Sequence, residues 1–252
     1  MDFSILHLLL LVVTGFAAGI INTLAGGGSN LTLPALMLMG MPPEVANASN
    51  RVGVLLQSLV GAWGYRKHGR LETDDLGPIF IPLVIGGLIG AMLATYAPSS
   101  LLKPMLLGTM LAMTIIMLVR PSVIFVEPGT QAKKTRDTPS SWIALGFAGL
   151  YGGFVHAGVG FVLITALAGT LRYDLLRANA LKLVCSLAFI SVSLLVFVIR
   201  DQVLWVPALI LSVGFIIGAH IAVIYSIRAK PQTLKWFLFA MTLVGCTAAM
   251  VF

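Results

Sequence analysis

Long apolar runs separated by short polar segments make up almost the whole chain. A helix needs roughly 20 apolar residues to cross the hydrocarbon core of a bilayer, and most of the runs reach that length. The pattern therefore predicts an all-α polytopic membrane protein with about 8–10 membrane segments. The expected segments are residues 5–25, 30–40, 50–65, 77–97, 101–119, 141–160, 161–171, 178–199, 203–227 and 234–252.

Three glycines and a polar pair interrupt the first part of this pattern. Gly26, Gly27 and Gly28 allow a sharp turn and let a ligand approach bare N–H groups. Ser29 and Asn30 are common helix N-caps, so a second helix is expected directly after them. Non-helical backbone is tolerated at membrane depth only where it is buried in protein or lines a cavity. Broken helices with N-termini aimed at an anion form the sites of many secondary transporters, so we predict a site here.

The composition agrees with a membrane protein. With 58% hydrophobic residues, 10% charged residues and a mean hydropathy of +1.00, the chain is too apolar for one soluble core. The basic residues that give the net charge of +7 lie in short loops, where they set membrane orientation. The charge therefore does not indicate nucleic-acid binding. Residues 1–25 lack the basic start of a signal peptide, so they are expected to form the first membrane helix.

Short sequences recur in the same order in the two halves of the chain, which suggests an internal repeat. The pairs are GFAAG at 15–19 with GFAGL at 146–150, AGGGS at 25–29 with HAGVG at 156–160, ANA at 46–48 with 178–180, and GGLIGAML at 86–93 with VGFIIGAHI at 213–221. Four Gly-x-x-x-Gly spacings, beginning at residues 15, 86, 149 and 214, also predict helix faces that approach closely.

A long polar stretch between the halves marks the expected domain boundary. We predict an N-terminal membrane repeat at 1–126, whose broken segment covers 5–40. A polar cytoplasmic linker at 127–140 follows, because this stretch is rich in Pro, Gly, Ser and charge. The C-terminal membrane repeat is expected at 141–252, with its broken segment at 141–171.

Lysine and arginine residues fix the expected orientation. If each broken segment returns to its starting side, the loops at 66–70, 120–136, 172–182 and 228–235 share one side and hold 13 of the 16 basic residues. The positive-inside rule makes that side cytoplasmic and both termini external. The halves then form inverted repeats whose breaks face each other near the midplane. The short broken arms are either re-entrant hairpins or full crossings.

Three segments of the sequence resemble a known family. The runs GFAAGIINTLAGGGSNLTLPAL, GMPPEVANASNRVGVLLQSLVGAWGYRKHG and RANALKLVCSLAFISVSLLVF are similar to the TauE/SafE family of membrane permeases, the sulfite exporters. The resemblance covers essentially the whole chain. It implies transport of small sulfur-containing anions, such as sulfite, sulfonates or sulfoacetate, across the bacterial cytoplasmic membrane. The second break departs from a clean glycine run, because it reads GGFVHAGVG.

Two positive side chains near the breaks are candidate ligands for such an anion. An anion needs compensating charge to leave water, because burying it unpaired costs many kcal/mol. Arg51 is expected to open the third apolar run from the outer side, and Lys182 to lie about a turn inside the eighth from the inner side. The alternative is that both side chains reach the lipid headgroups.

Amides, glycines and a histidine complete the candidate site. The amides either contact the ligand or, for the asparagines, cap helices and, for the glutamine, bond to a neighbouring helix. His156 lies inside the second break and could carry a coupling proton, as could His220; the alternative is that each is an interhelical donor. The full set of predicted substrate-binding residues is Gly26, Gly27, Gly28, Ser29, Asn30, Asn47, Asn50, Arg51, Gln57, His156, Gly158, Gly160, Asn179 and Lys182.

The sequence does not favour an enzyme. It contains no HExxH or GxSxG motif and no paired intramembrane acids, and GGGSN lacks the Lys-Ser/Thr of a phosphate loop. No cofactor or metal is expected. The expected partners are a small anionic substrate and the lipid bilayer, with protons or another coupling ion as an option. The preferred function is a secondary transporter that works by alternating access around a midplane site. An anion-selective channel and a non-transporting membrane scaffold are the alternatives.

Overall fold

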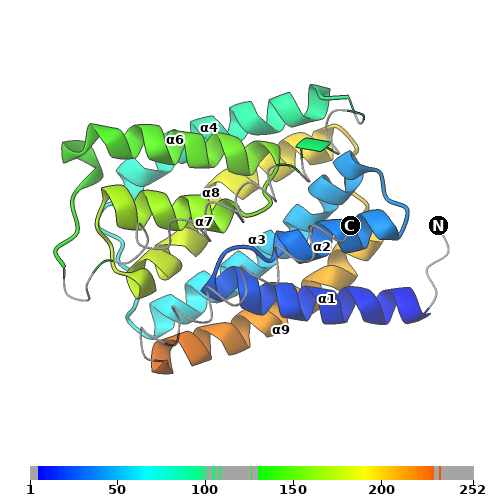
Figure 1. Cartoon of the computed structure of the whole chain (residues 1–252), viewed down its shortest axis with the longest axis horizontal. Coiled ribbons are helices and arrows are strands. Elements are labelled where there is room, and N and C mark those ends of the chain that lie inside the picture. Colours follow the sequence, from blue (N-terminus) through cyan, green and yellow to red (C-terminus); the bar gives the residue numbers. More distant parts are fainter. Residues whose placement is uncertain are drawn as a thin grey trace.

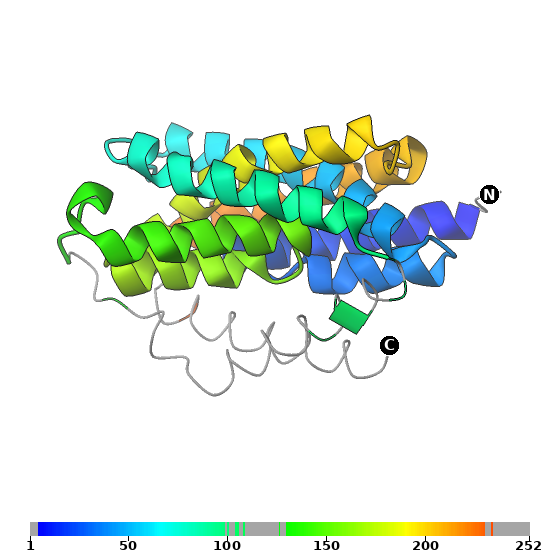
Figure 2. The ribbon, with the colours of Figure 1, turned by 90° about the horizontal axis from the view of Figure 1, so that it is seen from above.

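The chain forms a helical bundle. The computed structural model describes residues 5–98, 100, 104–105, 108, 126, 130–229 and 233. The runs expected at 101–119 and 234–252 lie almost entirely outside these residues. Every regular element within them is helical, which confirms the expected all-α class. Figures 1 and 2 show the long helices roughly aligned along one direction.

The helices of the first half follow the predicted apolar runs. Glycines at 26–28 separate the first two helices, and α3 begins before its apolar run because Pro43 suits a first helical turn and Glu44 suits a helix N-terminus. The helices are α1 (Ile5–Leu24), α2 (Ser29–Leu38), α3 (Pro43–Lys67) and α4 (Leu76–Tyr96).

The second half repeats this order of long and short helices. Its elements are a 3₁₀ turn η2 (Thr135–Asp137), α6 (Pro139–Phe154), α7 (Val159–Ile164), a π-helical turn η3 (Thr165–Thr170), α8 (Leu175–Ile199) and α9 (Trp205–Arg228). In Figure 1, α2 lies beside α1 and α7 beside α6.

The chain is a multi-pass membrane protein. Among the described residues, four helices are long and apolar enough to cross a membrane, at His7–Leu24, Leu76–Tyr96, Leu175–Ile199 and Trp205–Arg228. Their outward faces carry exposed large apolar side chains, such as Val13, Ile85 and Leu209, that suit contact with lipid tails. α3 is as long as these helices, but it carries polar and charged side chains that are buried inside the protein.

Glycine faces join helices that are far apart in the sequence. A Cβ added to Gly15 of α1 would lie 2.3 Å from the Leu211 carbonyl oxygen of α9. A Cβ on Gly90 of α4 would lie 2.0 Å from the Leu150 carbonyl oxygen of α6. The backbones therefore touch along α1–α9 and α4–α6, the two pairs that run side by side in Figure 1. The predicted close helix faces are confirmed.

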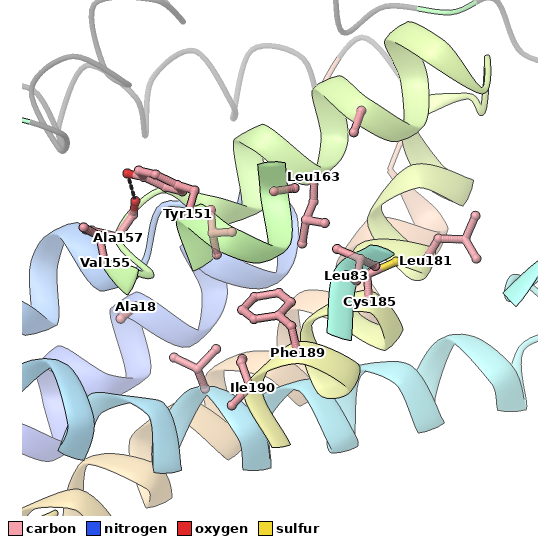
Figure 3. Packing of buried hydrophobic residues seen from close by; sticks show 14 of the residues in the cluster. Ala18, Leu83, Tyr151, Val155, Ala157, Leu163, Leu181, Cys185, Phe189 and Ile190 are labelled. Atoms are coloured by element: carbon pink, nitrogen blue, oxygen red, sulfur yellow. Dashed lines mark hydrogen bonds between the residues drawn. The ribbon is translucent and has the colours of Figure 1, made fainter. Parts of the chain in front are cut away.

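A continuous apolar core connects the two halves. Phe189 of α8 lies at its centre, with Leu83 of α4 and Tyr151 of α6 in the same cluster (Figure 3). The Tyr151 hydroxyl donates a 2.5 Å hydrogen bond to the Ala157 carbonyl oxygen, so this polar atom is satisfied inside the core. Cys185 is free and fully buried, as expected for a small apolar residue.

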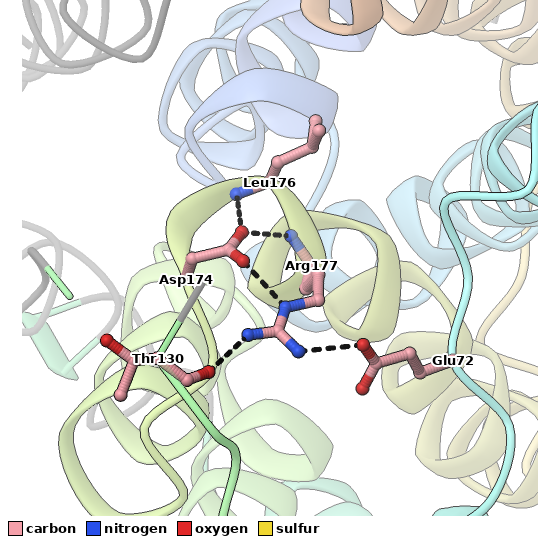
Figure 4. Close-up of polar contacts among 5 residues, drawn as sticks. All are labelled: Glu72, Thr130, Asp174, Leu176 and Arg177. Atoms are coloured by element: carbon pink, nitrogen blue, oxygen red, sulfur yellow. Dashed lines mark hydrogen bonds and ion pairs between the residues drawn. The ribbon is translucent and has the colours of Figure 1, made fainter. Parts of the chain in front are cut away.

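Arg177, at the start of α8, ties three loops together (Figure 4). Its guanidinium donates to Asp174 at 2.6 Å, to Glu72 at 2.8 Å and to the Thr130 carbonyl oxygen at 2.7 Å. Asp174 also caps α8, because its Oδ1 accepts from the backbone N–H groups of Leu176 and Arg177. These contacts link residues of both halves of the chain.

The two carboxylates of this network should contribute unequally to stability. Asp174→Ala removes a helix cap and is expected to lower the free energy of unfolding by about 1–2 kcal/mol. Glu72→Gln removes only a partly exposed ion pair and should cost less than about 1 kcal/mol. Thermal unfolding of the detergent-purified variants measures both effects. Equal losses for the two variants would contradict the capping role.

Candidate functional site

Two breaks in the helices meet at the centre of the bundle. The first lies between α1 and α2, where Gly26 has a φ of 100°. The second lies between α6 and α7, where His156 and Gly158 have φ values of 63° and 70°. A Cβ on Gly26 would lie 2.5 Å from the Gly160 Cα, so the two breaks are in direct backbone contact. Only residues without a side chain allow this approach.

Arg51 of α3 binds the end of α6. Its Nη1 donates to the Gly152 carbonyl oxygen at 2.8 Å, and its Nη2 donates to the Gly153 and Phe154 carbonyl oxygens at 2.7 and 3.3 Å. These are carbonyls that a helix C-terminus leaves without intrahelical partners. The guanidinium thus sits at the negative end of the α6 dipole, and its side chain is fully buried.

Three further groups hold Arg51 in place. Its Nη1 also donates to the Ser193 hydroxyl at 3.0 Å, and its Cζ lies 4.7 Å from the centre of the Phe197 ring. Asn47, one turn earlier on α3, donates to the same Phe154 carbonyl at 2.9 Å. α3, in the first half of the chain, therefore holds the end of α6, in the second half.

Lys182 of α8 makes the corresponding contacts with α1. Its Nζ donates to the Asn22 carbonyl oxygen at 2.8 Å, the Thr23 carbonyl oxygen at 3.0 Å and Asn179 Oδ1 at 2.9 Å. Asn179 in turn donates to the Leu24 carbonyl oxygen at 3.1 Å. Three acceptors match the three donors of an ammonium group. Each half thus supplies one cation and one amide to the helix end of the other half.

The positions of these cations correct one expectation and confirm another. Arg51 lies well inside α3 and is fully buried, and does not open the helix at the outer side. Lys182 is 1% exposed within α8, which confirms its expected place inside the eighth apolar run. Neither side chain reaches the headgroups, because both are held by carbonyls at the breaks. Hydrogen bonds to polar partners inside the bundle stabilise these side chains more than hydration at the membrane surface would.

The remaining amides attach the broken segments to α3. Asn50 donates to the Ser29 hydroxyl at 2.9 Å and accepts from the Thr32 hydroxyl at 2.7 Å. Gln57 accepts from Asn22 Nδ2 at 3.0 Å, so the alternative of bonding to a neighbouring helix is confirmed. The expected N-capping by Ser29 is wrong, because Gly28 occupies the N-cap position of α2 and no side chain caps it.

Several polar atoms around the breaks have no partner. In the part of the chain that the structure describes, the hydrogen bonds include no acceptor for the backbone N–H groups of Gly27, Gly28 and Ser29. Four buried side-chain atoms also lack partners within the described ranges. They are Asn30 Oδ1, Asn47 Oδ1, Arg51 Nε and His156 Nδ1. Leaving such groups unsatisfied costs about 1–3 kcal/mol each, so a polar ligand would stabilise this region.

The buried charge in the described residues is positive. Arg51 and Lys182 are buried charged side chains, and no buried Asp or Glu accompanies them there. A helix C-terminus carries a partial charge of about −0.5, so it offsets only part of one cation. The N-terminus of α2 adds positive potential at the first break. The described ranges also contain no group of three His, Cys, Asp or Glu placed to hold a metal ion.

The structure adds site residues that the sequence analysis missed. The backbone carbonyl oxygens of Asn22 and Thr23 accept hydrogen bonds from Lys182, and Thr23 Oγ1 also accepts one from Gln57 at 3.3 Å. Ser193 and Phe197 position Arg51. Asn22 and Thr23 are polar residues inside an apolar run, next to a glycine break, and this pattern could have identified them. Phe197 gives no such signal, because aromatic residues are common in membrane helices.

Comparison with known proteins gives the family of the chain. The sulfite exporter TauE/SafE family model matches residues 11–249. A probable membrane transporter protein from Haemophilus influenzae is 28% identical over 257 residues, covering 100% of this chain and 97% of that protein. ORF9 from Sinorhizobium, also named a probable membrane transporter protein, is 26% identical over 91% of this chain and 87% of its own length.

A third relative and the structural comparison complete this result. The probable membrane transporter protein YfcA of Escherichia coli K12 is 28% identical over 81% of this chain and 74% of its own length. No solved structure matches this chain. With a family model that covers nearly the whole chain, the protein belongs to the sulfite exporter TauE/SafE family of membrane transporters.

Proposed function

We propose that this protein is a secondary transporter for a small anion, by preference a sulfur-containing oxyanion or an organosulfonate such as sulfite or sulfoacetate. Membership of a membrane transporter family supports transport. The family description supports the sulfur-containing class. The proposed cycle is alternating access around a site near the midplane, formed where the two helix breaks touch at Gly26 and Gly160.

The surplus of positive charge beside the breaks is the observation that carries this proposal. Arg51 and Lys182 are buried without a carboxylate partner in the described residues, and helix ends offset them only in part. The bare N–H groups of Gly27, Gly28 and Ser29 lie at the start of α2. A sulfonate or sulfite oxygen can accept from such N–H groups, as anions do at other helix N-termini.

We further propose that the chain is built from two inverted repeats, each beginning with a hairpin broken at glycine. The contacts of the described helices support this arrangement. α1 packs on α9 as α6 packs on α4, and α3 packs on α9 as α8 packs on α4. The Asn47 and Arg51 contacts likewise correspond to those of Asn179 and Lys182. Two such halves rocking against each other would open the site alternately to each side.

Flux measurements in liposomes test the proposed function. The purified protein would be reconstituted and screened for uptake of radiolabelled sulfite, thiosulfate, taurine, sulfoacetate and chloride, together with an uncharged solute. The expected result is saturable uptake of at least one sulfur-containing anion, with counterflow driven by unlabelled anion inside. A channel would conduct without counterflow, and a scaffold would conduct nothing. Transport of the uncharged solute alone would contradict an anion site.

A matched variant links the flux to the site. Arg66→Gln removes an exposed positive charge near the end of α3, away from the breaks, and should leave flux unchanged. Arg51→Gln removes a buried one from the same helix. Equal flux in both variants would show that the transported anion does not depend on Arg51 at the proposed site.

A further inference from the structure

A groove with basic side chains lies between the ends of α3 and α9. It has a volume of about 400 Å³. Figure 1 shows the two helices side by side here, with the end of α9 in orange below that of α3 in cyan. Gly64 lets them approach, because a Cβ at this position would lie 3.0 Å from Val223 Cγ1. The groove lies away from the contact between the two breaks.

One end of the groove is lined by apolar side chains and the other by basic ones. Val60, Val223 and Ile224 give it apolar walls, as a site for hydrocarbon requires. Lys67 and Arg228, in the last turns of their helices, line the polar end together with His68. The two ends thus match the two parts of a lipid, with an apolar tail and a charged headgroup.

The basic groups at the polar end are available to a ligand. Neither Lys67 Nζ nor Arg228 has an acidic partner among the described residues, whose ion pairs all involve Arg177. Lys67 Nζ lies 5.2 Å from the centre of the Trp63 ring, and Trp63 is 59% exposed. Exposed tryptophan at the end of a membrane helix marks the headgroup level. These cations, which have no carboxylate partner among the described residues, therefore lie where lipid phosphates lie.

We propose that this groove binds the headgroup of an anionic phospholipid. The phosphate contacts Lys67 and Arg228, and one acyl chain follows the apolar walls of the groove. Basic pockets between membrane helices recognise such headgroups because the attraction acts near a low-dielectric region. His220, an exposed residue of α9 that also lines the groove, can donate to a glycerol ester oxygen. The site is independent of the transport proposal.

The charge of the groove disfavours other occupants. A second copy of this chain docking through the same face would bring Lys67 and Arg228 close to their own copies, and like charges repel. A zwitterionic lipid carries an ammonium group that offsets its phosphate, so the two cations gain less from it. Free phosphate lacks the acyl chain that fills the apolar part of the groove.

Native mass spectrometry of the full chain in detergent tests this site. Cardiolipin and phosphatidylethanolamine would be titrated separately. We expect cardiolipin to bind more tightly, and each of Lys67→Gln and Arg228→Gln to raise its Kd about fivefold, because a basic residue near a membrane surface contributes on the order of 1 kcal/mol. The double variant should lose about 25-fold. Inorganic phosphate at millimolar concentration should not displace the lipid.

The control is Arg66→Gln, which removes a neighbouring charge that does not line the groove. Its cardiolipin affinity should stay within about twofold of the unmodified protein, and all variants should keep the same Tm, because the changed side chains are exposed. Equal loss in Arg66→Gln, equal binding of phosphatidylethanolamine, displacement by phosphate, or a changed oligomeric state in place of lost lipid would each overturn the proposal.

Discussion

Anion flux through the Arg51→Gln variant is expected to fall to the background of empty liposomes, and the variant should also be less stable. The buried guanidinium donates to three carbonyls at the end of α6 and to Ser193. Glutamine is shorter, carries no charge and cannot reach all four acceptors. Removing one partner of a buried charged network costs about 3–5 kcal/mol. Counterflow assays and thermal unfolding in detergent measure the two effects.

The conservative variant separates charge from geometry at this position. Arg51→Lys keeps the positive charge but loses the planar fork that spans Gly152 and Gly153. We expect it to fold, since Lys182 serves the corresponding helix end with an ammonium group, and to retain part of the flux. If Arg51→Gln keeps full flux per folded molecule, Arg51 acts only as a structural support for α6.

Gly26→Ala is expected to cause the second large effect, a loss of about 3–5 kcal/mol or failure to accumulate in the membrane, from combined backbone strain and overpacking. Gly26 has a φ of 100°, which residues with a side chain rarely adopt. Its added Cβ would lie 2.5 Å from the Gly160 Cα and 2.6 Å from the Gly160 carbonyl carbon. Both are backbone atoms and cannot rotate away. Membrane-fraction yield and thermal unfolding measure the loss.

A second glycine serves as the matched control. Gly69 also has a positive φ, of 65°, but an added Cβ there meets nothing within 4 Å. Gly69→Ala should therefore cost only the left-handed backbone penalty, about 1–2 kcal/mol. Similar losses for Gly69→Ala and Gly26→Ala would show that the contact between the breaks contributes nothing beyond backbone strain.

Gly27 allows a rescue experiment at the same break. A Cβ at Gly27 would lie 2.7 Å from the Phe161 ring, and its three nearest atoms all belong to that ring. Because the obstacle is a side chain, Phe161→Leu should restore much of the stability lost in Gly27→Ala. No such rescue is expected for Gly28, whose Cβ would lie 2.2 Å from the Ala18 carbonyl oxygen.

Within the described residues, most helix positions could be predicted from the sequence. The start and end of α4 at Leu76 and Tyr96 follow the apolar run at 77–97 closely. The glycines at 26–28 predicted where α1 ends, since no other local feature interrupts the run. The start of α3 was predicted less well, because its first turns carry polar side chains that lie inside the bundle and do not extend the apolar run.

The sequence by itself determined the membrane class, the helices and the residue types near the breaks, because hydrophobic length and glycine content act locally along the chain. Only the tertiary structure decided the partners of the buried cations. Arg51 binds carbonyls 101 to 103 positions away and Lys182 binds carbonyls 159 and 160 positions away. A buried charge must find a partner wherever the fold brings one, and helix packing sets which helix ends lie near it.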